Sequence, residues 1–87
     1  MVIWTPRARN DLKSIYDHIF ENSPFNAKKV ATAIKQKADS VDGLPRLGKK
    51  IPELNDETIR EVSSYSWRII YLLRDDSIYI LTVVHKR

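Results

Sequence analysis

Apolar positions in the first half of the chain recur every three or four residues, the spacing of an amphipathic helix. The apolar run Val2–Trp4 predicts a short opening strand. Thr5 and Pro6 are residue types favoured at the N-cap and at the first position of a helix, so a helix is predicted from there to about Asn22. Its predicted apolar stripe consists of Ala8, Leu12, Ile15, Ile19 and Phe20.

A second amphipathic helix is predicted from about Pro24 to Val41, because Ser23 precedes a proline and so leaves the helical region. Two amphipathic helices joined by so short a link are expected to pack as an antiparallel hairpin. The apolar stripe of the second helix consists of Ala27, Val30, Ala31, Ile34, Ala38 and Val41, and its lysines lie largely off this stripe.

The segment "DGLPRLGKKIPELNDE" holds both glycines and two of the four prolines, so a loop or a set of turns is predicted there. Beyond it the apolar period changes to two, which predicts strands in "TIREV", "SWRIIYLLR" and "IYILTVVHKR", with "DDS" as a tight hairpin turn. The middle strand is apolar on both faces, as an inner strand would be. One of its faces carries Trp67, Ile69, Tyr71 and Leu73, and the other carries Ile70 and Leu72.

The predicted order is strand, two helices and a three-strand meander. This order indicates an α+β fold in which the helix hairpin packs on one face of a mostly antiparallel sheet. A chain of 87 residues is expected to form a single domain, 1–87. The absence of cysteine excludes disulfides, thiol catalysis and cysteine-based metal sites. No apolar run approaches membrane-spanning length, so a cytoplasmic protein is expected. The net charge of +4 suggests an acidic partner, either nucleic acid or protein.

Three segments carry a resemblance to a known family: "VIWTPRARNDLKSIYDHI", "PRLGKKIPEL" and "IREVSSYSWRIIYLLRDDSIYILTVVHKR". Together they resemble the RelE/ParE family of toxins from bacterial type II toxin–antitoxin modules, over essentially the whole chain. The resemblance implies a toxin that is held inactive by a cognate antitoxin. That antitoxin would carry a ribbon-helix-helix DNA-binding domain and a disordered, acidic C-terminal segment that wraps the toxin. The resemblance implies no metal or cofactor and allows a higher-order hetero-oligomer with the antitoxin.

Two activities occur in the family: RelE-like members cleave messenger RNA on the ribosome without metal, and ParE-like members poison DNA gyrase. If this chain is a ribonuclease, the resemblance gives Arg68, His85 and Arg87 as catalytic candidates. RNA-cleaving members have two lysines before the arginine that corresponds to Arg68. In a gapless comparison these positions hold Ile59 and Glu61 here, and a shift of one residue would bring in Arg60. A carboxylate where a phosphate should lie is unfavourable. RNA-cleaving members also have a tyrosine several residues beyond the arginine near which Arg87 falls, and this tyrosine has no counterpart here.

The helix hairpin and the segments "IREV", "WRIIY" and "VVH" resemble the ParE branch more closely. Inhibition of gyrase is therefore the favoured function. Ribosome-dependent cleavage of messenger RNA is one alternative, and a degenerate, non-toxic member that only binds its antitoxin is another.

Candidate target-binding residues are the cations of "RLGKK" and of the sheet end: Arg46, Lys49, Lys50, Arg60, Arg68, His85, Lys86 and Arg87. Candidate antitoxin-binding residues are Arg60, Arg68, Ile78, Ile80 and Val84. Simpler interpretations stay open for each group. Arg68 could be structural and pair with Glu53, Glu61 or an acid of the partner. The "RLGKK" cations could be solvated, and the alternating face Ile78, Ile80, Thr82 and Val84 could be buried. The target-binding interpretation requires that the last three strands pair and carry their cations to one shared rim.

Overall fold

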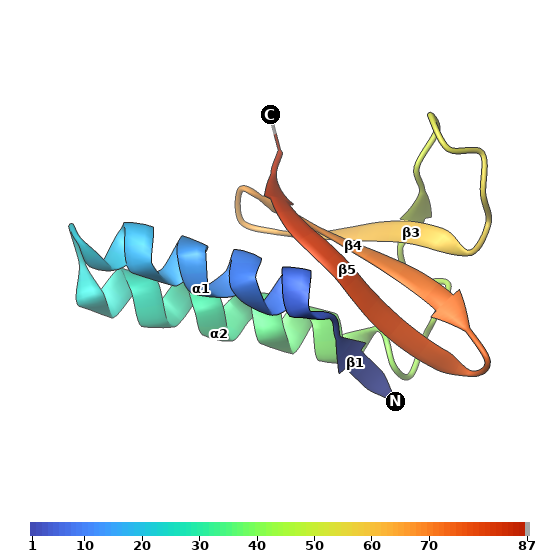
Figure 1. Cartoon of the computed structure of the whole chain (residues 1–87), viewed down its shortest axis with the longest axis horizontal. Helices are drawn as coiled ribbons and strands as arrows, with labels where there is room; N and C mark the ends of the chain where they lie inside the picture. The colour runs from blue at the N-terminus through green and yellow to red at the C-terminus, as the bar shows by residue number, and fades with distance from the viewer. Residues whose placement is uncertain (87) are drawn as a thin grey trace.

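The computed structural model describes residues 1–86, and it has the α+β architecture that the sequence predicts. Two helices pack on a sheet of five strands in the order β1-β5-β4-β3-β2 (Figure 1). β1 pairs with β5 in parallel, and the other neighbours pair antiparallel. The elements are β1 (Val2–Trp4), α1 (Pro6–Phe20), α2 (Pro24–Ser40), β2 (Lys49–Lys50), β3 (Ile59–Ser64), β4 (Trp67–Arg74) and β5 (Ser77–His85).

Both helices begin at a side-chain cap followed by a proline. The Thr5 hydroxyl accepts a hydrogen bond from the Ala8 amide at 3.2 Å, which confirms the predicted N-cap of α1. Ser23 caps α2 in the same way, by accepting from the amide of Asn26 at 3.1 Å, a role that the sequence analysis did not assign to it. α1 ends slightly before its predicted end, and Phe20, predicted in the apolar stripe, has 46% of its surface exposed. It lies at the end of the helix hairpin that projects beyond the sheet (Figure 1).

The core lies between the helix hairpin and one face of the sheet. In β4 the predicted apolar face is confirmed, because Ile69 and Tyr71 are fully buried and Trp67 and Leu73 pack against the same cluster. The buried cluster is completed by Ala8, Ile15, Ile34, Ala38, Val41, Val62, Ile78, Ile80 and Val83. Neither helix in the described part of the chain is long and apolar enough to span a membrane.

A β-bulge changes the alternation of β5. Thr82 lies opposite Ile70 and Ile80 lies opposite Tyr71, so Leu81 is the extra residue. Buried side chains therefore shift from even to odd positions along the strand, and Val83 is buried where Val84 is only partly buried. The prediction of one continuous buried face through Thr82 and Val84 was wrong beyond Ile80 for this reason.

The segment predicted as a loop or turns contains the short strand β2. Lys49 lies opposite Glu61, and Lys50 lies opposite Arg60, at the edge of the sheet beside β3. Two consecutive lysines have little intrinsic preference for strands. The strand therefore exists because tertiary contacts hold the segment against β3, and local sequence did not predict it.

Candidate functional site

The paired ends of β4 and β5 place Arg68 and His85 on opposite faces of the sheet. Arg68 lies opposite Val84, and Trp67 lies opposite His85. Directly opposite residues share a face and successive residues alternate, so the arginine is on the face away from the helices and the histidine is on the helix side. The His85 ring packs edge-on against the Trp67 ring with the centroids 5.1 Å apart. The predicted catalytic pair is therefore not assembled on one face, and Arg87 lies outside the described residues.

The Arg68 side chain forms an ion pair with a buried carboxylate. The guanidinium Nε donates to a carboxylate oxygen of Glu61 at 2.6 Å, and Glu61 is only 8% exposed. The Lys49 ammonium approaches the other carboxylate oxygen to 3.8 Å. The pairing of Arg68 with Glu61, one of those that the sequence left open, is thus confirmed. The carboxylate takes the Nε donor of Arg68 and offsets its charge, which weakens the attraction of Arg68 for a phosphate.

Arg60 is held by backbone carbonyls. Its guanidinium donates to the Gly48 carbonyl at 2.9 Å and to the Glu57 carbonyl at 3.0 Å. It lies opposite Tyr71, whereas Arg68 lies opposite Ser63, so the two arginines occupy different ends of the β3–β4 ladder.

The predicted cations therefore lie in two groups that meet at Glu61, which both Lys49 and Arg68 approach. We call Arg46, Lys49, Lys50 and Arg60 the loop group, and Arg68, His85 and Lys86 the strand-end group. The strand pairing on which the prediction depended is present, and the amide of Lys86 donates to the Ser66 carbonyl at 2.8 Å. The cations extend from the β4–β5 end to the loop, and the Glu61 carboxylate lies between Lys49 and Arg68.

The loop group is positioned by Tyr71, which the sequence analysis treated only as a core residue. Its hydroxyl accepts from the Gly48 amide at 2.8 Å and donates to the Pro45 carbonyl at 2.9 Å. Burial raises the pKa of the Tyr71 phenol, and the Gly48 amide and nearby Arg60 offset part of that rise. A methyl group on Gly48 would overlap the Tyr71 hydroxyl and come within 2.6 Å of the Glu61 carbonyl. A glycine inside a basic cluster was the only sequence signal of this close approach.

The sheet face away from the helices is apolar and only partly buried. Ile70 and Leu72 of β4 and Tyr79 and Val84 of β5 lie on this face, around the pair of Arg68 and Glu61. Of the predicted antitoxin-binding residues, Val84 and Arg68 belong to this face.

Two other predicted antitoxin-binding residues lie on the opposite side of the sheet. Ile78 and Ile80 are 2% and 0% exposed under the helices, and a partner could reach them only if the core opened.

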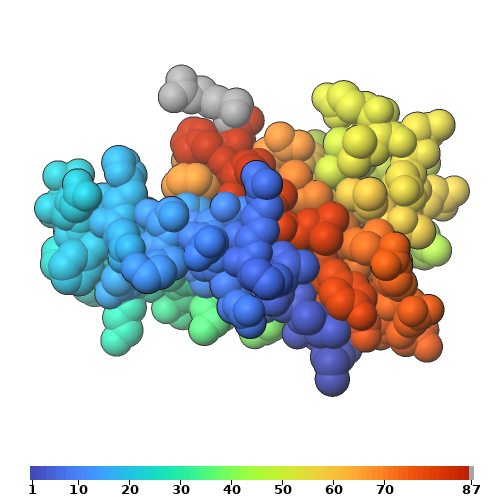
Figure 2. Space-filling model, viewed as in Figure 1, coloured from blue at the N-terminus to red at the C-terminus, as the bar shows by residue number. Residues whose placement is uncertain are grey.

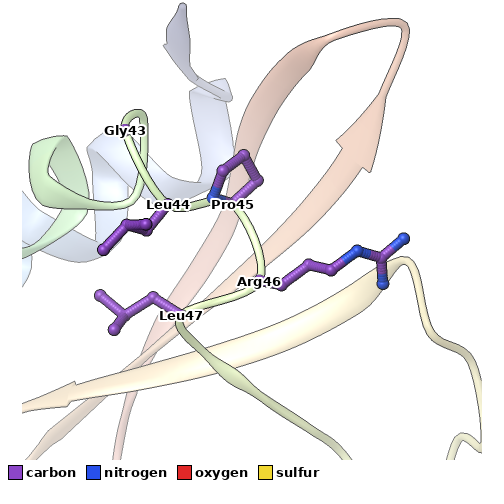
Figure 3. A pocket seen from close by; sticks show the side chains of 5 residues that line it. All are labelled: Gly43, Leu44, Pro45, Arg46 and Leu47. Atoms are coloured by element: carbon purple, nitrogen blue, oxygen red, sulfur yellow. The ribbon is translucent and has the colours of Figure 1, made fainter.

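A second apolar surface lies at the turn after α2. Leu44 and Leu47 are 64% and 48% exposed and line a cleft in the segment 43–47. Their side chains point to the same side of the segment, whereas Arg46 points away from them (Figure 3). Arg46 approaches the exposed carboxylate of Glu57 at 3.8 Å. Within residues 1–86, no three His, Cys, Asp or Glu side chains are arranged to hold a metal ion.

Three comparisons with known proteins give matches over nearly the whole chain. A family described as "ParE toxin of type II toxin-antitoxin system, parDE" matches residues 2–87. The chain is 34% identical over 85 residues to Toxin RelE2 of Caulobacter vibrioides, covering 97% of this chain and 92% of that protein. A solved structure titled "Chromosomal ParDE TA system from P. aeruginosa" aligns with a TM-score of 0.80 at 21% identity, over 99% of this chain and 95% of that one. At 21% identity, this structural match shows only that the two proteins share a fold.

Proposed function

The chain belongs to the RelE/ParE family of toxins of type II toxin–antitoxin systems, and from this premise we propose that it acts as a ParE-like inhibitor of DNA gyrase in the cytoplasm. In this proposal the protein blocks replication by binding gyrase, and it does not cleave RNA. A cognate antitoxin is the partner expected of a member of this family.

The observation that carries the proposal is the placement of Arg68 and His85. Metal-free cleavage of RNA needs a general acid and a cation at the same phosphate. Here the two side chains lie on opposite faces of the sheet, and Arg68 is paired with Glu61 at 2.6 Å. Binding to a protein target requires no such constellation, so this arrangement favours the ParE-like activity.

The exposed cations are the residues that we assign to the target. Arg46, Lys49 and Lys50 of the loop group are exposed on β2 and the turn before it, and Lys86 is exposed after β5. Arg60 and Arg68 hold the loop and the sheet together through intramolecular bonds, and His85 packs on Trp67. The long stems of the exposed lysines let them reach a partner without disturbing the fold.

The antitoxin is proposed to cover the sheet face away from the helices. Four partly buried apolar side chains of β4 and β5 share this face with Arg68, and a chain of net charge +4 attracts an acidic segment. An acidic residue of the antitoxin would compete with Glu61 for Arg68. We further propose that this antitoxin has a disordered acidic C-terminal segment and a ribbon-helix-helix domain.

A gyrase supercoiling assay tests the proposal. Purified protein is added to gyrase, ATP and relaxed plasmid, and supercoiling is expected to stop at micromolar toxin and to recover when antitoxin is added. Lys49→Gln/Lys50→Gln is expected to raise the inhibitory concentration about tenfold. Lys35→Gln/Lys37→Gln removes the same charge from α2 and serves as the matched control. Unimpaired supercoiling at micromolar protein, together with cleavage of ribosome-bound message, would establish the RelE-like alternative instead. Inactivity in both assays would leave a protein that only binds antitoxin.

A further inference from the structure

A shallow cleft runs along α2 to the turn between β3 and β4, far from the loop group. Its volume is about 400 Å³, and it is lined by Phe25, Lys28, Lys29, Thr32, Ala33, Gln36 and Tyr65. The start of α2 belongs to the end of the hairpin that projects from the sheet, and the segment after β2 lies at the opposite end of the molecule (Figures 1 and 2). The cleft is therefore distant from the loop group, whereas its Tyr65 end adjoins the strand-end group, because the Lys86 amide donates to the carbonyl of Ser66 in the same turn.

Two aromatic rings at this cleft are exposed. Phe25 is 76% and Tyr65 is 55% exposed, although aromatic side chains usually gain from burial. Tyr65 also has a φ of 55°, a left-handed conformation that is unfavourable for a bulky side chain and that Gly or Asn adopts at lower cost. The fold thus holds a strained tyrosine at the surface beside an exposed phenylalanine, and neither position contributes much to the core.

The charged side chains that line the cleft have one sign. α2 carries four lysines, Lys28, Lys29, Lys35 and Lys37, and its first acidic residue is Asp39 near its end. All four are exposed, and Lys28 and Lys29 line the cleft, where no acidic side chain is among the described lining residues. A cluster of cations along one helix is the electrostatic footprint of a protein that binds a polyanion.

We propose that this cleft binds single-stranded nucleic acid. Unpaired bases would stack on Phe25 and Tyr65, and two phosphates would lie against Lys28 and Lys29, the arrangement by which proteins bind single strands without sequence preference. The Thr32 hydroxyl and the Gln36 amide supply hydrogen-bond groups between the rings. The Asp and Glu side chains of an acidic peptide would satisfy the lysines but offer no aromatic face to the rings, whereas every nucleotide supplies both a phosphate and a base, so nucleic acid uses all of the exposed groups. The proposal does not depend on the choice between gyrase and the ribosome.

Fluorescence anisotropy of labelled single-stranded ten-mers tests the proposal directly. The probes are dT10 and U10, which tell DNA from RNA, and the titration is run at several salt concentrations. We expect saturable binding at 50 mM salt that weakens as salt rises. Two phosphate contacts predict a slope of log K against log salt of about −1.4 from this cleft alone.

The variants separate stacking from general basicity. Phe25→Ala removes an exposed ring and is expected to weaken binding about tenfold or more, because each stacked base contributes that much. Tyr65→Asn is expected to act in the same direction, and asparagine accepts the left-handed backbone. Lys28→Gln/Lys29→Gln is expected to reduce the slope by about 1.4. Lys35→Gln/Lys37→Gln is the control on the same helix, expected to change the slope by less than half as much.

Three results would overturn the proposal. The first is no binding of either probe at 100 μM protein and 50 mM salt. The second is binding that Phe25→Ala leaves unchanged. The third is an equal loss from the two lysine pairs, which would indicate attraction to net charge only. If an acidic amphipathic peptide bound the cleft in a Phe25-dependent way and neither oligonucleotide did, the cleft would be a protein-docking surface and the inference would be wrong.

Discussion

Removing the Tyr71 hydroxyl should destabilise the domain and detach its basic loop. In Tyr71→Phe the Gly48 amide loses its acceptor at 2.8 Å and the Pro45 carbonyl loses its donor at 2.9 Å. The Gly48 amide is buried with this bond, and an unsatisfied buried donor costs about 1–3 kcal/mol. The Pro45 carbonyl is only partly buried, so water can replace much of its bond. The expected total is about 2–3 kcal/mol.

A loss of this size is easy to measure in a small domain. For a domain of 60–100 residues, about 1 kcal/mol corresponds to 4–8 °C in Tm, so Tyr71→Phe should lower Tm by about 10–20 °C. Urea unfolding should show a lower midpoint with an unchanged m value if the unfolding stays two-state. Faster hydrogen exchange of the Gly48 amide should accompany the loss, because that amide is the donor that is released.

Tyr79→Phe is the matched control for this experiment. Tyr79 is on the neighbouring strand and partly buried, and within residues 1–86 its hydroxyl makes no hydrogen bond, so its removal should change stability by less than about 0.5 kcal/mol. Equal Tm values for Tyr71→Phe and Tyr79→Phe, with the Gly48 amide still protected, would refute the reasoning that the hydroxyl anchors the loop.

Three further predictions follow from the same contacts. Gly48→Ala should lower the free energy of unfolding in urea by about 3 kcal/mol, because its methyl group would overlap the Tyr71 hydroxyl. Gly43→Ala is the control and should be nearly neutral, because a methyl group there faces open space. Similar losses of stability from both variants would contradict this. A double-mutant cycle of Glu61→Gln and Arg68→Gln should give a coupling of about 1–3 kcal/mol in the free energy of unfolding. Salt should reduce this coupling, because Arg68 is 31% exposed. Additive effects of the two substitutions would show that the pair contributes nothing. Spectrophotometric titration should show one tyrosine ionising above the usual pH of about 10, and Tyr71→Phe should abolish it. Because the folded-state pKa of Tyr71 is raised, its contribution to stability is complete below about pH 10 and is lost as pH rises through the folded value; a variant that loses an ionisation near pH 10 and keeps the one at higher pH would contradict this.

The elements of the fold could be predicted because local signals coincide with tertiary packing. Thr5 with Pro6 marks the start of α1, and the alternation around Ile69 and Tyr71 marks the inner strand. The hairpin turn after β4 could also be predicted, from its two consecutive aspartates. Asp75 and Asp76 have φ values of 51° and 63°, and aspartate is one of the few residue types that tolerate this backbone conformation.

What could not be predicted depends on register and on contacts between distant segments. The bulge at Leu81 has no sequence mark such as a glycine, yet it decides that Val83 is buried and that Val84 is on the outer face. The bulge is also part of the β4–β5 pairing that places Arg68 and His85 on opposite faces of the sheet. Alternation within each strand could not relate the two residues, because the pairing of the strands was unknown.

The candidate site was predicted in its composition but not in its arrangement. The sequence named the cations as candidates but could not show that Arg60 and Arg68 lie at different ends of the β3–β4 ladder, or that Lys49 and Arg68 meet at Glu61. Pairing of Arg68 with Glu61 was among the predicted options. The anchor at Tyr71 was missed because its partners, Gly48 and Pro45, are more than twenty residues away and offer only backbone groups.

The most direct test of the account compares the purified protein with its His85→Ala variant in the gyrase supercoiling assay. If the protein acts by binding gyrase and His85 takes no part in the activity, both proteins should stop supercoiling at the same micromolar concentration. Undisturbed supercoiling by the unaltered protein, together with a cleavage of ribosome-bound messenger RNA that His85→Ala abolishes, would contradict the account.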